Sequence, residues 1–129
     1  MLKKISILIL LILWTVFIIF TIFISQDNQS KYPTTGRDLH EYFGDARFSI
    51  LNGHDANGNN TLVLYDEKKI KTIDEEIKIY DEIDGYVYLI GEKGYTFLDY
   101  VKGEYIQSKS LSSFNQEQLS IFQELEKKL

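Results

Sequence analysis

An uncharged run near the N-terminus constrains this chain more than any other feature. Between Lys4 and Asp27 no side chain carries a charge, and the apolar core of the run extends from Ile5 to Ile24. Three hydroxyl residues interrupt it: Ser6, Thr15 and Thr21. As an α-helix this core spans about 30 Å, the thickness of the hydrocarbon layer of a bilayer. The sequence therefore predicts one membrane crossing over residues 5–25.

A cleaved secretory signal is the alternative explanation of this run. Signal peptides have apolar regions of about 7–15 residues and end at small side chains that the peptidase accepts. Here the apolar run is longer, and its end, "IFTIFISQ", offers Phe and Ile instead. The chain also contains no Cys that could carry a lipid. We therefore predict an uncleaved signal anchor.

Charges on either side of the run predict its orientation. Lys3 and Lys4 precede it, whereas Asp27 and several amides follow it. The positive-inside rule then places residues 1–4 in the cytoplasm as a short tip, and the stalk 26–33 and a domain over 34–129 outside. A chain rich in Ile and Lys and poor in Ala, Arg and Pro is typical of AT-rich bacterial genomes, so we expect the cell membrane of a Gram-positive-type bacterium.

The exported part is acidic and free of cysteine. After the anchor the chain carries 12 basic and 19 acidic side chains, a formal charge of −7. This balance argues against nucleic acid as a partner and against contact of the domain with an anionic membrane surface, because both require a basic face. A cationic peptide or protein fits better, besides the membrane lipid around the anchor. Without disulfides, the domain depends on its apolar core for stability.

The spacing of apolar residues predicts an α+β fold for the domain. In "TTGRDLHEYFG", Thr35 as N-cap and Gly44 as terminator indicate a short helix of two turns. From Arg47 to Ser108 the period changes to two, which predicts a small antiparallel β-meander. The strands are expected at "RFSIL", "TLVLY", "IKTI", "YVYLIG", "YTFLDY" and "EYIQS", with Gly94 in a tight turn.

A longer helix is expected at the C-terminus, in "SFNQEQLSIFQELEKKL". Asn115 is the predicted N-cap, and the apolar residues that follow occupy one side of the helix, wide enough to cover a sheet. Those residues are Leu119, Ile121, Phe122, Leu125 and Leu129.

The stretch "NGHDANGNN" is the best candidate for a metal site. Asp55, Asn57 and Asn59 alternate as the first ligands of a calcium loop do, and Asp66 falls at the twelfth position. The sixth position is Asn60 in place of Gly, and strands flank the stretch where helices are required. Because Asn-Gly between two alternating runs is a strong hairpin signal, we predict a plain connection and no metal.

The sequence offers no recognisable catalytic constellation. His54 and Asp55 are neighbours in the chain, which rarely gives the geometry of a triad, and His40 is the only other histidine. We therefore predict no catalytic residue, no cofactor and no enzymatic activity. A small surface hydrolase with paired carboxylates stays open as an alternative, because 19 acidic residues can supply such a pair.

Two surface features favour binding. The run "DEEIKIYDEID" (residues 74–84) alternates Ile with acids, which predicts a half-buried edge with a solvated outer side. Five of the nine tyrosines fall between residues 86 and 105, where alternation sends half of them outward. The expected function is a protein or peptide interaction module of the immunity or accessory type. The alternatives are the hydrolase and a structural subunit of a membrane complex.

Overall fold

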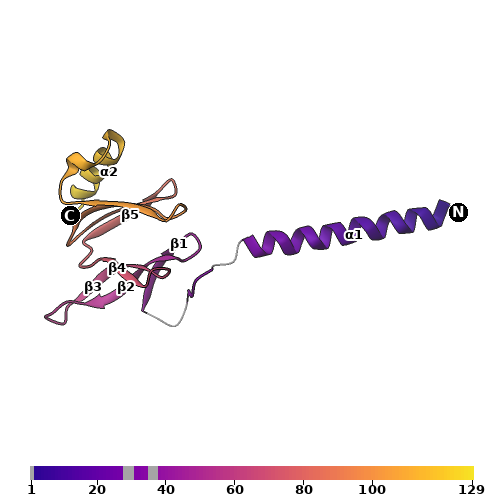
Figure 1. Cartoon of the computed structure of the whole chain (residues 1–129), viewed down its shortest axis with the longest axis horizontal. Helices are drawn as coiled ribbons and strands as arrows, with labels where there is room; N and C mark the ends of the chain where they lie inside the picture. The colour runs from indigo at the N-terminus through magenta and orange to yellow at the C-terminus, as the bar shows by residue number, and fades with distance from the viewer. Residues whose placement is uncertain (1, 28–30, 35–37) are drawn as a thin grey trace.

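The computed structural model describes residues 2–27, 31–34 and 38–129, with side chains of the first helix described up to residue 22 (Figure 1). It contains a long N-terminal helix, α1 (Leu2–Asp27), and a folded domain. The first sheet of the domain has four strands: β1 (Leu39–Phe43), β2 (Phe48–His54), β3 (Asn60–Asp66) and β4 (Lys71–Asp74). The second sheet has four more: β5 (Ile79–Ile83), β6 (Tyr86–Gly91), β7 (Gly94–Asp99) and β8 (Glu104–Ser108). A 3₁₀ turn, η1 (Leu111–Ser113), leads into the last helix, α2 (Gln116–Glu126).

The two sheets are antiparallel meanders that pack face to face. In each sheet every ladder joins strands that are consecutive in the chain. Alternate residues such as Val87 and Leu89 of β6 point toward the first sheet, where they meet Phe48, Ile50 and Leu64. All five are fully buried. The predicted α+β class and antiparallel meander are confirmed, and the meander is divided between two sheets.

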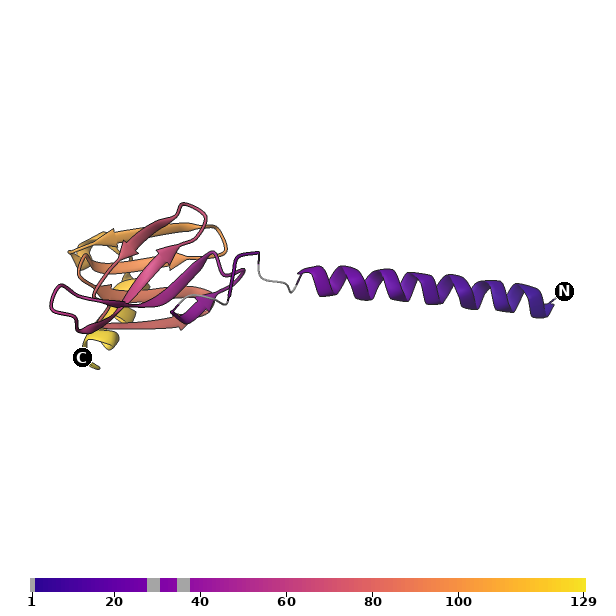
Figure 2. The same cartoon turned by 90° about the horizontal axis from the view of Figure 1, so that it is seen from below.

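Helix α2 forms a third layer on the outer side of the second sheet (Figures 1 and 2). Tyr88 and Ile90 point away from the first sheet and pack against Phe122 and Leu125 of α2. Asn115 caps the helix as predicted, and its capping box with Gln118 satisfies donors at the helix start. Leu129 was expected on the covering side, but α2 ends at Glu126 and Leu129 is exposed.

The short helix predicted between Thr35 and Gly44 is wrong over the residues that the structure describes. Leu39–Phe43 is the strand β1, which pairs with β2, and Phe43 is buried between Tyr80 and Tyr100. A helix of two turns is barely stable alone, whereas pairing with β2 satisfies the backbone and buries an aromatic ring. Thr35, the expected cap, lies outside the described residues.

The predicted Gly94 turn and the predicted edge position of the acidic run are confirmed. Gly94 has the positive φ that the tight β6–β7 turn demands. Strand β5, which comes from the acidic run, is the edge of the second sheet. A two-residue turn, Asp84–Gly85, with both φ angles positive, joins it to β6.

Helix α1 meets the length and composition requirements of a membrane span. Its segment Lys3–Ile22 has a mean hydropathy of 3.0, and none of it is buried within the structure. A signal sequence near the N-terminus can also meet these length and composition requirements.

Two stalk residues contact the domain. The backbone N–H groups of Lys31 and Tyr32 donate to the carbonyl oxygen of Asp45, at 3.0 and 3.3 Å. Asp45 lies in the turn between β1 and β2, so the chain that follows α1 attaches to this end of the sandwich.

Candidate functional site

An aromatic surface remains on the outer side of the second sheet where α2 does not cover it. Tyr88, Phe97 and Ile106 are direct neighbours across β6, β7 and β8, and all three point outward. Tyr88 is buried against Phe122 of α2, so it marks the border between the covered and the uncovered part of the sheet. The ring of Tyr86 lies 5.1 Å from that of Phe97. Tyr86 and Ile106 are 37% and 45% exposed, so this apolar part of the sheet is accessible to solvent.

Three hollows surround Tyr86 and together form what we call the Tyr86 groove. The largest has a volume of about 500 Å³ and lies over β6, β7 and β8. The second, of about 230 Å³, lies between the sheet and the start of α2 and is lined by Tyr88, Asn115 and Ile121 among others. The third, of about 240 Å³, is bordered by the β5–β6 and β7–β8 turns. All three hollows are partly open to solvent and share Tyr86, so an extended segment of a ligand can lie across them.

The rim of the Tyr86 groove is acidic. Asp84, Asp99, Glu104 and Glu117 line its hollows, against one lysine, Lys102. Tyr88 lines the hollow beside α2, and burial, with a contribution from Glu117, raises the pKa of Tyr88. This phenol therefore stays neutral at physiological pH. The groove combines an apolar floor with negative charge at its edges, an arrangement that favours a cationic ligand with an apolar portion.

The buried carboxylates lie elsewhere. Asp66 and Asp74 are 1% and 0% exposed, and neither lines the Tyr86 groove. Within the described residues no group of three His, Cys, Asp or Glu side chains is arranged to hold a metal ion.

The structure does not bring the four calcium candidates together. Asp55 closes the β2–β3 loop by accepting hydrogen bonds from the backbone N–H groups of Asn59 and Asn57, at 2.9 and 2.8 Å. These bonds, that of Asn59 above all, lower the pKa of Asp55. Asp66 lies at the opposite end of β3. The loop therefore supplies its own partners for the carboxylate.

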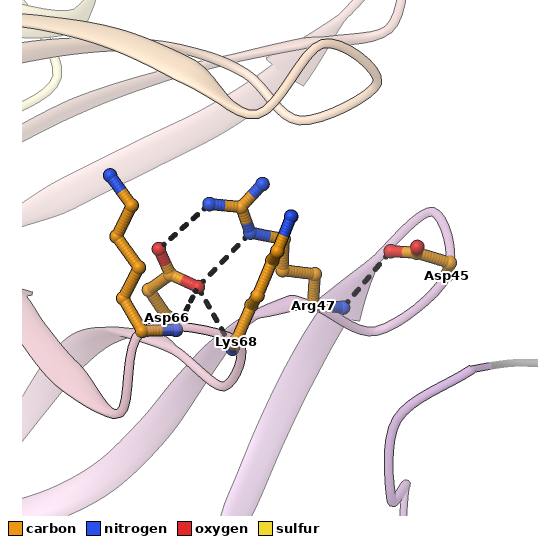
Figure 3. Close-up of polar contacts among 5 residues, drawn as sticks. Asp45, Arg47, Asp66 and Lys68 are labelled. Atoms are coloured by element: carbon orange, nitrogen blue, oxygen red, sulfur yellow. Dashed lines mark hydrogen bonds and ion pairs between the residues drawn. The ribbon is translucent and has the colours of Figure 1, made fainter.

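Asp66 is half of an ion pair with Arg47 (Figure 3). The guanidinium donates from Nε to Oδ1 and from Nη2 to Oδ2, both at 3.1 Å, and the backbone N–H groups of Lys68 and Lys69 also donate to Oδ1. Burial alone would raise the pKa of Asp66, but these donors outweigh it and hold the pKa below its usual value. The pair is a structural element that joins the ends of β2 and β3.

Asp74 was not singled out by the sequence beyond its place in the acidic run. Its Oδ1 accepts from the backbone N–H groups of Glu75 and Lys93, at 2.8 and 3.1 Å, which connects β4 to the β6–β7 turn of the other sheet. Its Oδ2 has no hydrogen-bond partner. Burial raises the pKa of Asp74.

The two histidines lie on different strands of the first sheet. His40 is an exposed residue of β1 whose ring meets that of Tyr80 edge to face at 6.3 Å. His54 ends β2 and pairs with Asn60 across the β2–β3 hairpin. Neither residue lines a hollow of the Tyr86 groove.

No protein-family description, curated protein or solved structure matches this chain. The groove was also not predicted as a unit, although its signal is present in the sequence. Three consecutive strands, "YVY", "YTF" and "EYI", place aromatic or aliphatic residues on one face with acids at their ends.

Proposed function

We propose that this chain is a single-pass membrane protein whose extracytoplasmic domain is a non-enzymatic interaction module for a cationic peptide or protein. The Tyr86 groove is the observation that carries the proposal. It offers an exposed apolar floor bordered by four carboxylates, on a domain that is acidic overall. Aromatic floors with charged rims are typical of protein-binding surfaces.

Anchoring supports a role at a membrane surface. The span Lys3–Ile22 would hold the chain in the bilayer, with Lys3 and Lys4 on the cytoplasmic side and the domain outside. An accessory or immunity role, in which the domain captures a cationic protein that reaches the outer face of a Gram-positive-type cell membrane, fits this placement.

Binding is favoured over paired-carboxylate hydrolysis by the distribution of the acids. A hydrolase of this kind needs two carboxylates in one cavity, one of them in an apolar setting that raises its pKa. Asp74 is buried with a raised pKa, but its carboxylate faces the backbone of the β6–β7 turn and does not line the Tyr86 groove.

Binding of fluorescent peptides to the full chain in nanodiscs tests the proposal. A peptide that alternates Lys with Leu should bind, and its Glu-for-Lys counterpart should not. Tyr86→Ala should weaken binding about tenfold or more, as the loss of a central aromatic contact does. Tyr42→Ala removes a tyrosine of similar exposure from β1 and is the matched control.

Charge variants test whether the ligand responds to the acids at the rim of the groove or to the net negative charge of the domain. Asp84→Asn and Glu117→Gln remove two rim charges, and Asn tolerates the positive φ of residue 84. Glu75→Gln and Glu92→Gln remove the same charge at exposed positions outside the groove. Equal affinities of these two double variants, or unchanged binding by Tyr86→Ala, would exclude the groove as the binding site.

A further inference from the structure

The two most exposed apolar side chains among the described residues of the domain lie on neighbouring turns. Ile70, in the β3–β4 turn, is 76% exposed, and Val101, in the β7–β8 turn, is 81% exposed. Arg47 connects the turns, because its guanidinium binds Asp66 before the first turn and lies against Gly103 in the second. Both apolar tips therefore project from the same end of the sandwich.

The backbone at Ile70 is unfavourable for the residue that occupies it. Ile70 has φ +51°, in the left-handed region that β-branched residues avoid. Glycine or asparagine would relieve this strain. Because its side chain is exposed, Ile70 contributes little to the core that would offset the strain. An apolar contact outside the folded domain would explain its presence.

Lysines flank Ile70, and a single lysine lies next to Val101. Lys68, Lys69 and Lys71 flank Ile70, and Lys102 follows Val101, with all four side chains exposed. The β3–β4 turn holds one acid, Glu67, which is half-buried, whereas Asp84 and Asp99 border Val101. This end is thus locally basic around Ile70 although the exported part carries a formal charge of −7.

The stalk holds this end close to α1. Lys31 and Tyr32 bind the carbonyl of Asp45, two residues before Arg47. The chain from Asp27, the last residue of α1, to Lys31 reaches at most roughly 14 Å. If α1 crosses a membrane, as the proposed function holds, the turns with Ile70 and Val101 lie within reach of its surface.

We propose that this end of the domain docks on the anionic bilayer in which α1 is inserted. Ile70 and Val101 enter the interfacial layer, and the four lysines lie among the lipid headgroups. Apolar tips with adjacent lysines bind anionic membranes by this combination of burial and charge. The hollow lined by Val101 and Tyr86 then opens beside the membrane, so the Tyr86 groove would receive its ligand there.

The absence of cysteine allows a direct test with single labels. An environment-sensitive fluorophore is attached to Ile70→Cys, Val101→Cys or Asn57→Cys of the full chain, which is then reconstituted into vesicles of phosphatidylcholine with or without phosphatidylglycerol. Asn57, in the β2–β3 loop at the other end of the strands, is the control. We expect emission from positions 70 and 101 to shift to shorter wavelength and to be quenched by spin-labelled lipid when phosphatidylglycerol is present. Replacing Lys68, Lys69 and Lys102 with Gln should abolish the shift.

Vesicle flotation and peptide binding show whether a negative result concerns the docking, the anchor or the proposed function. Chains that float but keep labels 70 and 101 as water-exposed as label 57 overturn the docking while leaving anchoring and peptide binding intact. Chains that do not float overturn both the anchor and the docking. A shift at 70 and 101 that already occurs in detergent, and that grows with protein concentration, would assign this end to contact between copies and also overturn the proposal.

Discussion

Arg47 and Asp66 form a two-point ion pair at the end of the β2–β3 ladder, and Asp66 is almost completely buried there. Arg47→Met leaves that carboxylate without its counter-ion, so we expect a loss of about 3–5 kcal/mol in the free energy of unfolding. The double variant Arg47→Met, Asp66→Asn keeps an acceptor for the N–H groups of Lys68 and Lys69 and should recover much of the loss. Urea unfolding of the full chain in a mild detergent, followed by near-ultraviolet circular dichroism, measures both. A double variant no more stable than Arg47→Met would contradict this account.

The same pair should make the domain sensitive to acid. Because the folded-state pKa of Asp66 lies below its unfolded value of about 3.9, its contribution is complete above that value and disappears as pH falls through the folded pKa. Between neutral and acidic pH, the free energy of unfolding should therefore fall less for Asp66→Asn than for the wild type. If the free energy of unfolding depends on pH equally in both proteins, Asp66 is not the group that makes the domain sensitive to acid.

Asp74 should behave in the opposite way. Its folded-state pKa is raised, so its ionised form destabilises the domain at neutral pH and its protonated form does not. Asp74→Asn keeps an oxygen for the N–H groups of Glu75 and Lys93, and we expect it to be more stable than the wild type at neutral pH. The difference should vanish in acid. Asp74→Ala, which leaves both N–H groups without their acceptor, is the destabilised control.

Gly103 and Gly58 allow a matched test of the contact with Arg47. Both have positive φ, +73° and +79°, so Ala at either position costs on the order of 1 kcal/mol in backbone strain. At Gly103 the new Cβ would also come within 2.1 Å of Arg47 Nη1, whereas nothing lies within 4 Å at Gly58. Arg47 is held by Asp66 and cannot move without breaking the pair. Thermal unfolding should therefore show a clearly larger loss for Gly103→Ala, and equal losses would contradict the contact.

Tyr100 should weaken the fold at high pH. Its hydroxyl donates to Glu82 at 2.6 Å, and this bond, with burial, raises the pKa of Tyr100 to about 12. The unfolded chain loses the proton near pH 10, so stability should fall between about pH 10 and about pH 12. Tyr100→Phe keeps the stacking on Phe43 and should reduce this alkaline loss. Tyr42→Phe, which removes the hydroxyl of an exposed tyrosine of β1, is the control, and an equal reduction of the alkaline loss in both variants would contradict the assignment to Tyr100.

How much of the fold could be predicted depended on whether the determining contacts were local. Period-two segments, the Gly94 turn and the Asn115 cap are local signals, and each was found where the sequence indicated it. Strand β1 was mistaken for a helix because Leu39, Tyr42 and Phe43 also match helical spacing. Its pairing with β2 and the packing of Phe43 on Tyr100, distant in the chain, decide its structure.

In the candidate site, too, local features could be predicted from the sequence and features that depend on long-range packing could not. The outward tyrosines could be expected from alternation. The Tyr86 groove depends in addition on where α2 packs, because the helix covers Tyr88 and Ile90 and leaves Tyr86 and Ile106 exposed. For Asp66, the local spacing was misleading. Its spacing from Asp55 suggested a shared ligand set. In the structure Asp66 is the last of the seven residues of β3, so the strand separates it from the loop, and its partner is Arg47.

The strand order of the two sheets has a consequence for how the domain folds. Because every ladder joins consecutive strands, each hairpin closes a short loop, and little chain entropy is lost before its contacts form. The long-range step is the meeting of two completed meanders, which also first covers Phe48, Ile50 and Leu64. A chain that emerges from its N-terminus can thus assemble in order of synthesis, with the apolar face of the first meander exposed until the second has followed.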